Sequence, residues 1–212
     1  MSNFEIMTQS LRQYLSHHGI SMDFISNLHD TSLNDTGCNH IYKGDCDFDV
    51  ISMDAVAKDG YKIIKQIDPN SNPITTTDAF LINEDNEWFF IEFKDSSITG
   101  DKKGLKDNII KKAYESWYML LNVLYYLREH GESCELFDDE DPVKFAKEHV
   151  TFILVCSFDK NLRVYDLAKD CIRAKKHYTP LFMMRLKEYL FKDAYVYTEN
   201  LFEREFVSKF SM

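Results

Sequence analysis

The sequence predicts a mixed α/β (α+β) fold in which helices flank a central mixed sheet, and three stretches carry this prediction. Residues 75–94 consist of two strand-like runs joined by a short polar turn. Residues 102–129 place apolar side chains at the spacing of one face of a long helix. Residues 150–156 form an unbroken apolar run of strand length, which is typical of a strand buried on both faces. A chain of 212 residues is long enough for a single domain with a sizeable core.

The other elements follow from local patterns. Apolar residues at helical spacing predict a first helix over residues 3–18, with Ser2 and Glu5 as a capping box and Gly19 as its stop. The remaining expected elements are a short helix within 21–28, a loop ending near Gly44, strands within 46–56 and at 61–67, a helical turn at 142–149, a short strand at 162–167, a helix at 180–191, a strand at 193–198 and a terminal helix at 199–210.

Composition excludes several classes of protein. A hydrophobic content of 44% with 14% aromatic residues argues for a folded globular protein. The longest apolar runs are too short for a membrane span, and the first residues lack a secretion signal, so we expect a cytoplasmic protein. The five scattered cysteines indicate free thiols, and the spacing of Cys38, His40 and Cys46 fits no common zinc pattern.

The net charge of −10 is unevenly distributed. Residues 1–100 carry 6 Lys or Arg against 16 Asp or Glu, whereas residues 101–212 carry 19 of each. An acidic protein binds nucleic acid poorly without specific contacts, although bound divalent cations and local lysine clusters offset this.

Three ionisable residues stand inside the strands of the 75–94 hairpin: Asp78, Glu92 and Lys94. A three-residue loop at 84–86 would pair residues whose numbers sum to 170, so Asp78 would lie opposite Glu92, with Cβ atoms roughly 4.5–5.5 Å apart. Two carboxylates at that distance repel each other unless a cation lies between them. The pattern therefore predicts a divalent-metal site with Lys94 at its edge. The alternative is a solvated hairpin face, against which the aromatic run 88–93 argues.

The spacing of Asp78, thirteen residues and then Glu92-Phe93-Lys94 resembles the PD-(D/E)xK nuclease superfamily, which has the restriction-endonuclease-like fold. Thr77 stands where the proline of that motif would be. The order of expected elements is similar to the αβββαβ core of this superfamily over most of residues 1–197.

This resemblance implies a nuclease that hydrolyses phosphodiester bonds with Mg²⁺ or Mn²⁺. Asp78 and Glu92 would hold the metal, the Phe93 carbonyl would add a ligand, and Lys94 would orient the attacking water. Many members place a further metal-binding Glu on the first helix, a role open to Glu5, although the capping box is the simpler account of that residue.

Lysines at the start of the long helix suggest the contact with nucleic acid. Lys102, Lys106 and Lys112 are the candidates, because cations near a helix start are disfavoured unless a polyanion approaches. Members of the resembled superfamily often have a Lys or Gln on this helix facing the site, which singles out Lys106 and Lys112. The plainer interpretation is lysines whose stems lie along apolar surface near a helix end. DNA is favoured over RNA as the partner. The oligomeric state stays open, with a homodimer as one option because members often pair to cut two strands. Two alternatives stay open: a catalytically inactive binding or regulatory protein on the same fold, and an unrelated α/β interaction domain with a chance motif.

Overall fold

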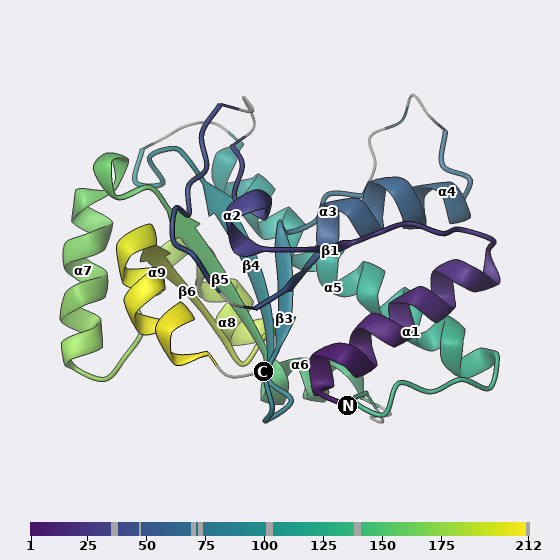
Figure 1. The fold of residues 1–212 in the computed structure, drawn as a ribbon. Helices are drawn as coiled ribbons and strands as arrows, with labels where there is room; N and C mark the ends of the chain where they lie inside the picture. Colours follow the sequence, from purple (N-terminus) through teal and green to yellow (C-terminus); the bar gives the residue numbers. More distant parts are fainter. Residues whose placement is uncertain are drawn as a thin grey trace.

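A computed structural model describes residues 1–34, 38–46, 48–68, 71, 74–100, 104–137 and 141–210 (Figure 1). The strands among these residues form one six-stranded sheet in the order β1-β2-β3-β4-β5-β6. Their bounds are β1 Ile25–Ser26, β2 Val50–Ser52, β3 Ala79–Ile82, β4 Trp88–Lys94, β5 Val150–Cys156 and β6 Asp193–Thr198. Neighbouring strands from β1 to β4 are antiparallel, while β4, β5 and β6 run parallel, so the mixed sheet flanked by helices is confirmed.

Helices supply the connections that parallel strands require. The α-helices are α1 Asn3–His17, α2 Leu28–Thr31, α3 Met53–Ala55, α4 Lys62–Ile64, α5 Leu105–Glu129, α6 Pro142–His149, α7 Leu162–Arg173, α8 Met184–Tyr189 and α9 Glu199–Glu205. A π-helical segment, η1 Val56–Tyr61, joins α3 to α4, and 3₁₀ turns occur at η2 Phe158–Lys160, η3 Leu181–Met183 and η4 Val207–Lys209. α5 and α6 connect β4 to β5, and α7 and α8 connect β5 to β6.

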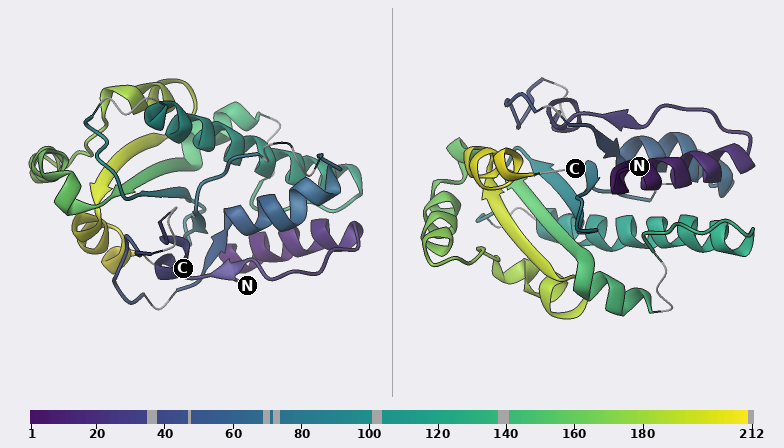
Figure 2. Two further views of the ribbon diagram at one scale, coloured as in Figure 1. Left: turned by 90° about the horizontal axis from the view of Figure 1, so that it is seen from above. Right: turned by 60° about the horizontal axis from the view of Figure 1, so that its bottom comes forward.

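Both faces of the central strand β4 are covered. On one face, the ring of Trp88 lies 4.8 Å from Phe145 of α6 and 6.2 Å from Trp117 of α5. On the other face, Phe89 packs 5.0 Å from Phe206, which follows α9. Figure 2 shows the sheet between α5 on one side and α9 on the other. A polar side chain on β4 is therefore enclosed unless it lies at an end of the strand.

The hairpin has the register expected from the sequence. Ala79 pairs with Ile91 and Ile82 with Trp88, so the paired numbers sum to 170. Asn86 closes the loop in the left-handed region with φ +58°, and its side-chain oxygen accepts a hydrogen bond from the Trp88 indole at 2.7 Å. The regular ladder stops at Ala79, because the Asp78 N–H donates to the carbonyl of Ile91 instead of pairing with Glu92.

Two expected strands are wrong. Residues 61–64 continue a helix that begins after Ser52, and 65–67 follow its end; the buried Val56, Ala57, Gly60 and Tyr61 show the helical spacing. Residues 162–167 begin α7, whose buried Val164 and Ala168 lie one helical turn apart. In both places a short window of alternating residues concealed a longer helical period.

The region before the hairpin also differs in detail. The strand expected within 46–56 is only the three residues of β2, which Ser52 ends by capping α3 through its hydroxyl. The short helix expected within 21–28 is replaced by β1 and the following α2. Polar loop residues separate these short elements, so their boundaries are only weakly marked in the sequence.

The helix expected at 180–191 is the 3₁₀ turn η3 followed by α8, and the terminal helix expected at 199–210 ends at Glu205 before η4. Other expected features are confirmed. The capping box at Ser2 and Glu5 is present, α5 ends before Gly131 with φ +79°, Pro142 opens α6, and β5 is buried throughout. All five cysteines are free thiols. Over the part of the chain that the structure describes, every helix is too short or too polar to cross a membrane.

Candidate metal and catalytic site

Glu92 and Lys94 lie on one face of β4, at the carboxyl end of the strand. Glu92 sits beside Leu154 of β5 and is 0% exposed. The side chain of Lys94, the last residue of the strand, is 9% exposed. Crevices at the carboxyl ends of parallel strands are the usual ligand sites of open α/β sheets. The location therefore favours a ligand-binding role for these two charged residues.

The carboxylates of Asp78 and Glu92 both contact the ammonium of Lys112, which belongs to α5. The Lys112 Nζ lies 3.2 Å from Asp78 Oδ1 and 2.9 Å from Glu92 Oε2. The Lys94 Nζ lies 2.9 Å from the other Glu92 oxygen, Oε1. The Phe93 N–H donates to Asp78 Oδ2 at 2.7 Å. Two acids and two lysines thus form one partly buried four-charge cluster.

The segment that carries Asp78 is held by hydrogen bonds from α5. Ser116 Oγ accepts from the Thr77 N–H at 2.8 Å, and a carboxylate oxygen of Glu115 accepts from the Thr75 N–H at 2.7 Å. Lys112 stands one helical turn before Ser116, on the same side of the helix. Side chains of a single helix therefore fix the segment just before β3 and supply the cation that contacts it.

Burial sets the electrostatics of the cluster. Burial, and then repulsion by Glu92, raise the pKa of Asp78 to about 7, although Lys112 and the Phe93 N–H act in the opposite direction. Burial also opposes the charged form of Lys112, but attraction by Glu92 and Asp78 outweighs it and holds the pKa of Lys112 above its usual value. The pKa of Lys94 is raised in the same way, mainly through Glu92. The two lysines therefore remain charged at neutral pH, whereas Asp78 is close to its midpoint.

The cluster opens to a pocket of about 460 Å³. Its lining includes Asp78, Phe93, Lys94, Asp95 and Lys160. Lys160 holds Asp95 at the rim of the pocket, with Nζ 2.8 Å from Oδ1. A polar ligand can thus reach Asp78 and Lys94 from solvent, while Glu92 stays behind them.

The cluster offers two carboxylates as ligands for a hard divalent cation. Oxygens of Asp78 and Glu92 converge on one point, which the Lys112 ammonium now fills, and carboxylates are the ligands that Mg²⁺ and Mn²⁺ prefer. Glu92 Oε1 is buried and contacts the Lys94 ammonium at 2.9 Å. The contacts with Lys112 are longer than the roughly 2.0–2.1 Å of Mg²⁺–oxygen bonds, so the carboxylates would have to draw inward.

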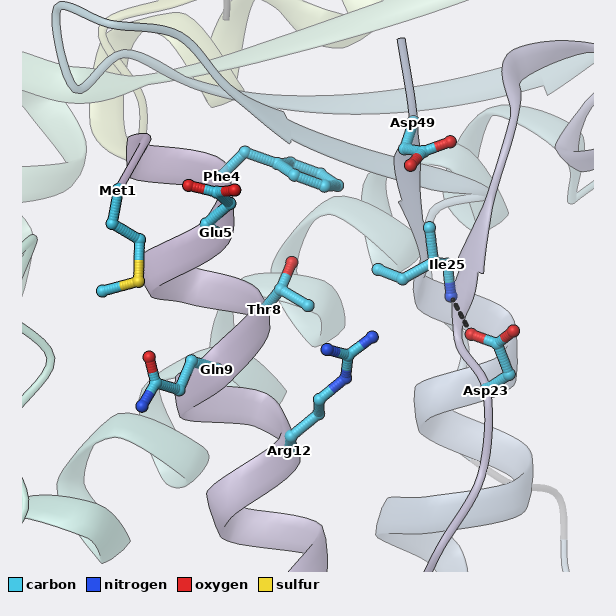
Figure 3. Close-up of a pocket in the computed structure, with 9 residues that line it drawn as sticks. All are labelled: Met1, Phe4, Glu5, Thr8, Gln9, Arg12, Asp23, Ile25 and Asp49. Carbon is cyan, nitrogen blue, oxygen red and sulfur yellow. Dashed lines mark hydrogen bonds between the residues drawn. The ribbon is translucent and has the colours of Figure 1, made fainter.

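Glu5 is not brought to this cluster. Its carboxylate accepts a hydrogen bond from the Ser2 N–H at 2.7 Å, as the capping box requires. Figure 3 shows Glu5 in a separate, larger pocket of about 550 Å³ between α1 and β1, which Arg12 and Asp49 also line. That pocket contains none of the hairpin residues of the cluster. The first-helix metal ligand that the resemblance implied therefore has its carboxylate engaged elsewhere.

The three lysines expected to contact nucleic acid fall in different places. Lys112 joins the cluster. Lys106 lies in another pocket, with its Nζ 6.0 Å from the centre of the Phe182 ring. Lys102 lies outside the described residues. Lys112 faces the site as the resemblance implies, and its spacing from the buried Ile109 and Ser116 places it at the edge of the buried face. Its direct contact with both acids is a further feature that the structure adds.

One other group of metal-ligating side chains occurs among the described residues: His29, Asp30 and His40. The two imidazole rings stack with centroids 3.8 Å apart and an angle of 16° between them. Ring nitrogens bind metals in the plane of the ring, so two nearly parallel rings cannot both face one ion without rotating. The group is accordingly less suited to a metal than the cluster around Glu92.

Comparison with models of protein families, with curated proteins and with solved structures gives no match for this chain. The residues of the site are therefore the basis for inferring the function.

Proposed function

We propose that this protein is a metal-dependent nuclease that hydrolyses phosphodiester bonds with Mg²⁺ or Mn²⁺. The observation that carries this proposal is the convergence of Asp78, Glu92 and two lysines at the carboxyl end of β4, beside an open pocket. The resemblance of the Asp78, Glu92-Phe93-Lys94 spacing to the PD-(D/E)xK superfamily supports the same activity. The hairpin register supports it further, because Ala79 pairs with Ile91 and so sets Asp78 and Glu92 next to the last pair of the ladder.

Each residue has a role that follows from its position. Asp78 and Glu92 would hold the cation, which would lower the pKa of a bound water and neutralise charge on the phosphate. Lys94 borders the pocket with its ammonium against Glu92, so it can orient a water and stabilise negative charge on a phosphate oxygen. The Phe93 N–H fixes Asp78 Oδ2, which leaves Oδ1 facing the cluster.

An acidic protein can bind nucleic acid only if the attraction is confined to the site itself. When both acids are ionised, as at about pH 8, the four charges of the cluster cancel, so a polyanion gains little from the resting site. A bound divalent cation would make the site positive, and the substrate would be attracted to the pocket while the rest of the surface stays unfavourable.

Cleavage assays test the proposal directly. Labelled single- and double-stranded DNA and RNA are incubated with Mg²⁺, with Mn²⁺ or with EDTA, and the products are separated by size. We expect cleavage only with metal, and a loss of at least about 100-fold in rate for Glu92→Gln and Lys94→Met. Glu84→Gln, in the exposed hairpin turn, is the matched control and should cut at the parental rate.

Two results would contradict the proposal. Equal cleavage by the parent, Glu92→Gln and Lys94→Met would place any activity outside the cluster. Tight binding of a nucleic acid with no cleavage under any metal condition would instead favour the inactive binding protein on the same fold.

A further inference from the structure

The ammonium of Lys112 occupies the point on which the two carboxylates converge. Its Nζ lies 2.9 Å from Glu92 Oε2 and 3.2 Å from Asp78 Oδ1, and its side chain is only 12% exposed. Lys112 belongs to α5, whereas Glu92 and Lys94 belong to β4. The ammonium between the carboxylates is therefore supplied by the helix that packs against the sheet. An ammonium and a divalent cation cannot share the position, because both require the same oxygens.

The charge count shows what the lysine does. Asp78 and Glu92 contribute two negative charges, and Lys94 and Lys112 contribute two positive ones. Without Lys112, two neighbouring carboxylates, one of them fully buried, would share only the Lys94 ammonium. Leaving a buried charge unpaired is strongly destabilising. Lys112 thus neutralises the cluster in the metal-free protein.

We propose that Lys112 is a built-in counter-ion that a divalent cation displaces when it binds between Asp78 and Glu92. This inference rests on the proposed function, because it concerns the same site. The exchange adds two positive charges and leaves the lysine ammonium beside the site, so the cluster changes from neutral to a net charge of +2. The site therefore attracts a polyanion only when the metal is bound.

Removing the ammonium should have opposite effects on the two ligands. Lys112→Met eliminates the competitor, so Mn²⁺ should bind more tightly. With Mn²⁺ bound, the variant cluster carries a net charge of +1 instead of +2, so a nucleic acid should bind more weakly and with a smaller salt dependence. A lysine that only packs against the site would change neither affinity in this way.

Calorimetry with Mn²⁺ alone measures the first effect, on the full chain at about pH 8. We expect Lys112→Met to bind Mn²⁺ at least about tenfold more tightly than the parent, which corresponds to about 1.4 kcal/mol. The control is Lys111→Met, whose side chain is 52% exposed next to Lys112 and contacts Glu115 instead of the cluster. Its Mn²⁺ affinity should equal that of the parent.

Thermal melting curves provide a second measure of Mn²⁺ binding in case Lys112→Met folds poorly. In EDTA, Lys112→Met should melt below the parent, and saturating Mn²⁺ should restore more of its melting temperature than it adds to the parent. Lys112→Gln, which keeps hydrogen bonding without charge, is the second variant and should also bind Mn²⁺ more tightly.

The outcomes separate the two proposals. If the parent and both variants fail to bind Mn²⁺, the metal-dependent function fails and this inference falls with it. If the parent binds Mn²⁺ and neither Lys112 variant binds it more tightly, the counter-ion role is wrong while the metal site stands. Tighter Mn²⁺ binding together with weaker oligonucleotide binding supports both.

Discussion

Replacing Asp78 by asparagine should make the metal-free protein more stable at pH 8. Burial and the nearby Glu92 raise the pKa of Asp78 from 3.8 to about 7, so its ionised form is less favourable in the folded protein than in the unfolded chain. Asparagine has nearly the same shape and carries no charge. The substitution therefore removes an electrostatic cost that the folded state bears whenever Asp78 is ionised.

The magnitude follows from the difference in pKa between the folded and unfolded states. A rise of about three in pKa corresponds to about 4 kcal/mol at a pH above both values. Asparagine offers one acceptor oxygen where Asp78 has two, one contacting the Phe93 N–H and one contacting Lys112. The loss of one of these contacts leaves a buried donor without its acceptor and costs about 1–3 kcal/mol. We expect a net gain of about 1–3 kcal/mol in the free energy of unfolding.

The sign can be checked through its dependence on pH. As pH rises from about 4 to about 7, the unfolded chain loses the Asp78 proton while the folded protein keeps it, so the parent loses stability over that window. The asparagine side chain of the variant cannot titrate. The advantage of the variant should therefore be full at pH 8, less than half as large at pH 5 and absent below about pH 4.

Urea denaturation in EDTA at these pH values measures the difference. Asp85→Asn, in the exposed hairpin turn, is the control and should change the free energy of unfolding by less than about 0.5 kcal/mol. A variant that is less stable than the parent at pH 8, or an effect that does not vary with pH, would refute the reasoning.

Two further predictions concern the same site. Ser116→Ala leaves the buried Thr77 N–H without its acceptor and should lower the free energy of unfolding by about 1–3 kcal/mol in urea denaturation, whereas Tyr114→Phe, exposed on the same helix, should have little effect. Binding of Mn²⁺ should release about one proton per site at about pH 6, because Asp78 is then largely protonated, and almost none at about pH 8. Calorimetry in buffers of different ionisation enthalpy counts the protons, and equal release at both pH values would contradict the assignment.

The hairpin could be predicted because its information is local. Strand alternation, a polar three-residue turn and a left-handed Asn86 fix the register between residues close in sequence, and this register holds up to the pair of Ala79 with Ile91. The expected direct pairing of Asp78 with Glu92 is absent, because the Asp78 N–H bonds to the Ile91 carbonyl. The helix from α3 to α4 was missed for a related reason. Its buried residues run from Met53 to Tyr61. The two stretches at either end of this run, 46–56 and 61–67, each have the residue pattern of a short strand.

The contact made by Lys112 required information that no local pattern contains. Lys106 and Lys112 are six residues apart on α5, and each faces partly inward. The lysine that reaches Glu92 is selected by where α5 crosses the sheet, which depends on packing such as that of Trp88 against Trp117 and on the bond from Thr77 to Ser116. These contacts are non-local, so helical periodicity alone could not distinguish the two lysines.

The cluster is poorly explained as a device for stability. Replacing a buried ion pair by well-packed apolar residues is often neutral or stabilising, and Glu92 lies in a strand whose neighbours are aromatic and aliphatic. A purely structural cluster should lose stability when asparagine replaces Asp78, because one attraction to Lys112 disappears. A ligand site that holds its acids close together against repulsion should gain stability and lose metal affinity in the same variant. The stability and the metal affinity of that single variant, measured together, therefore distinguish the two explanations independently of any assay for cleavage.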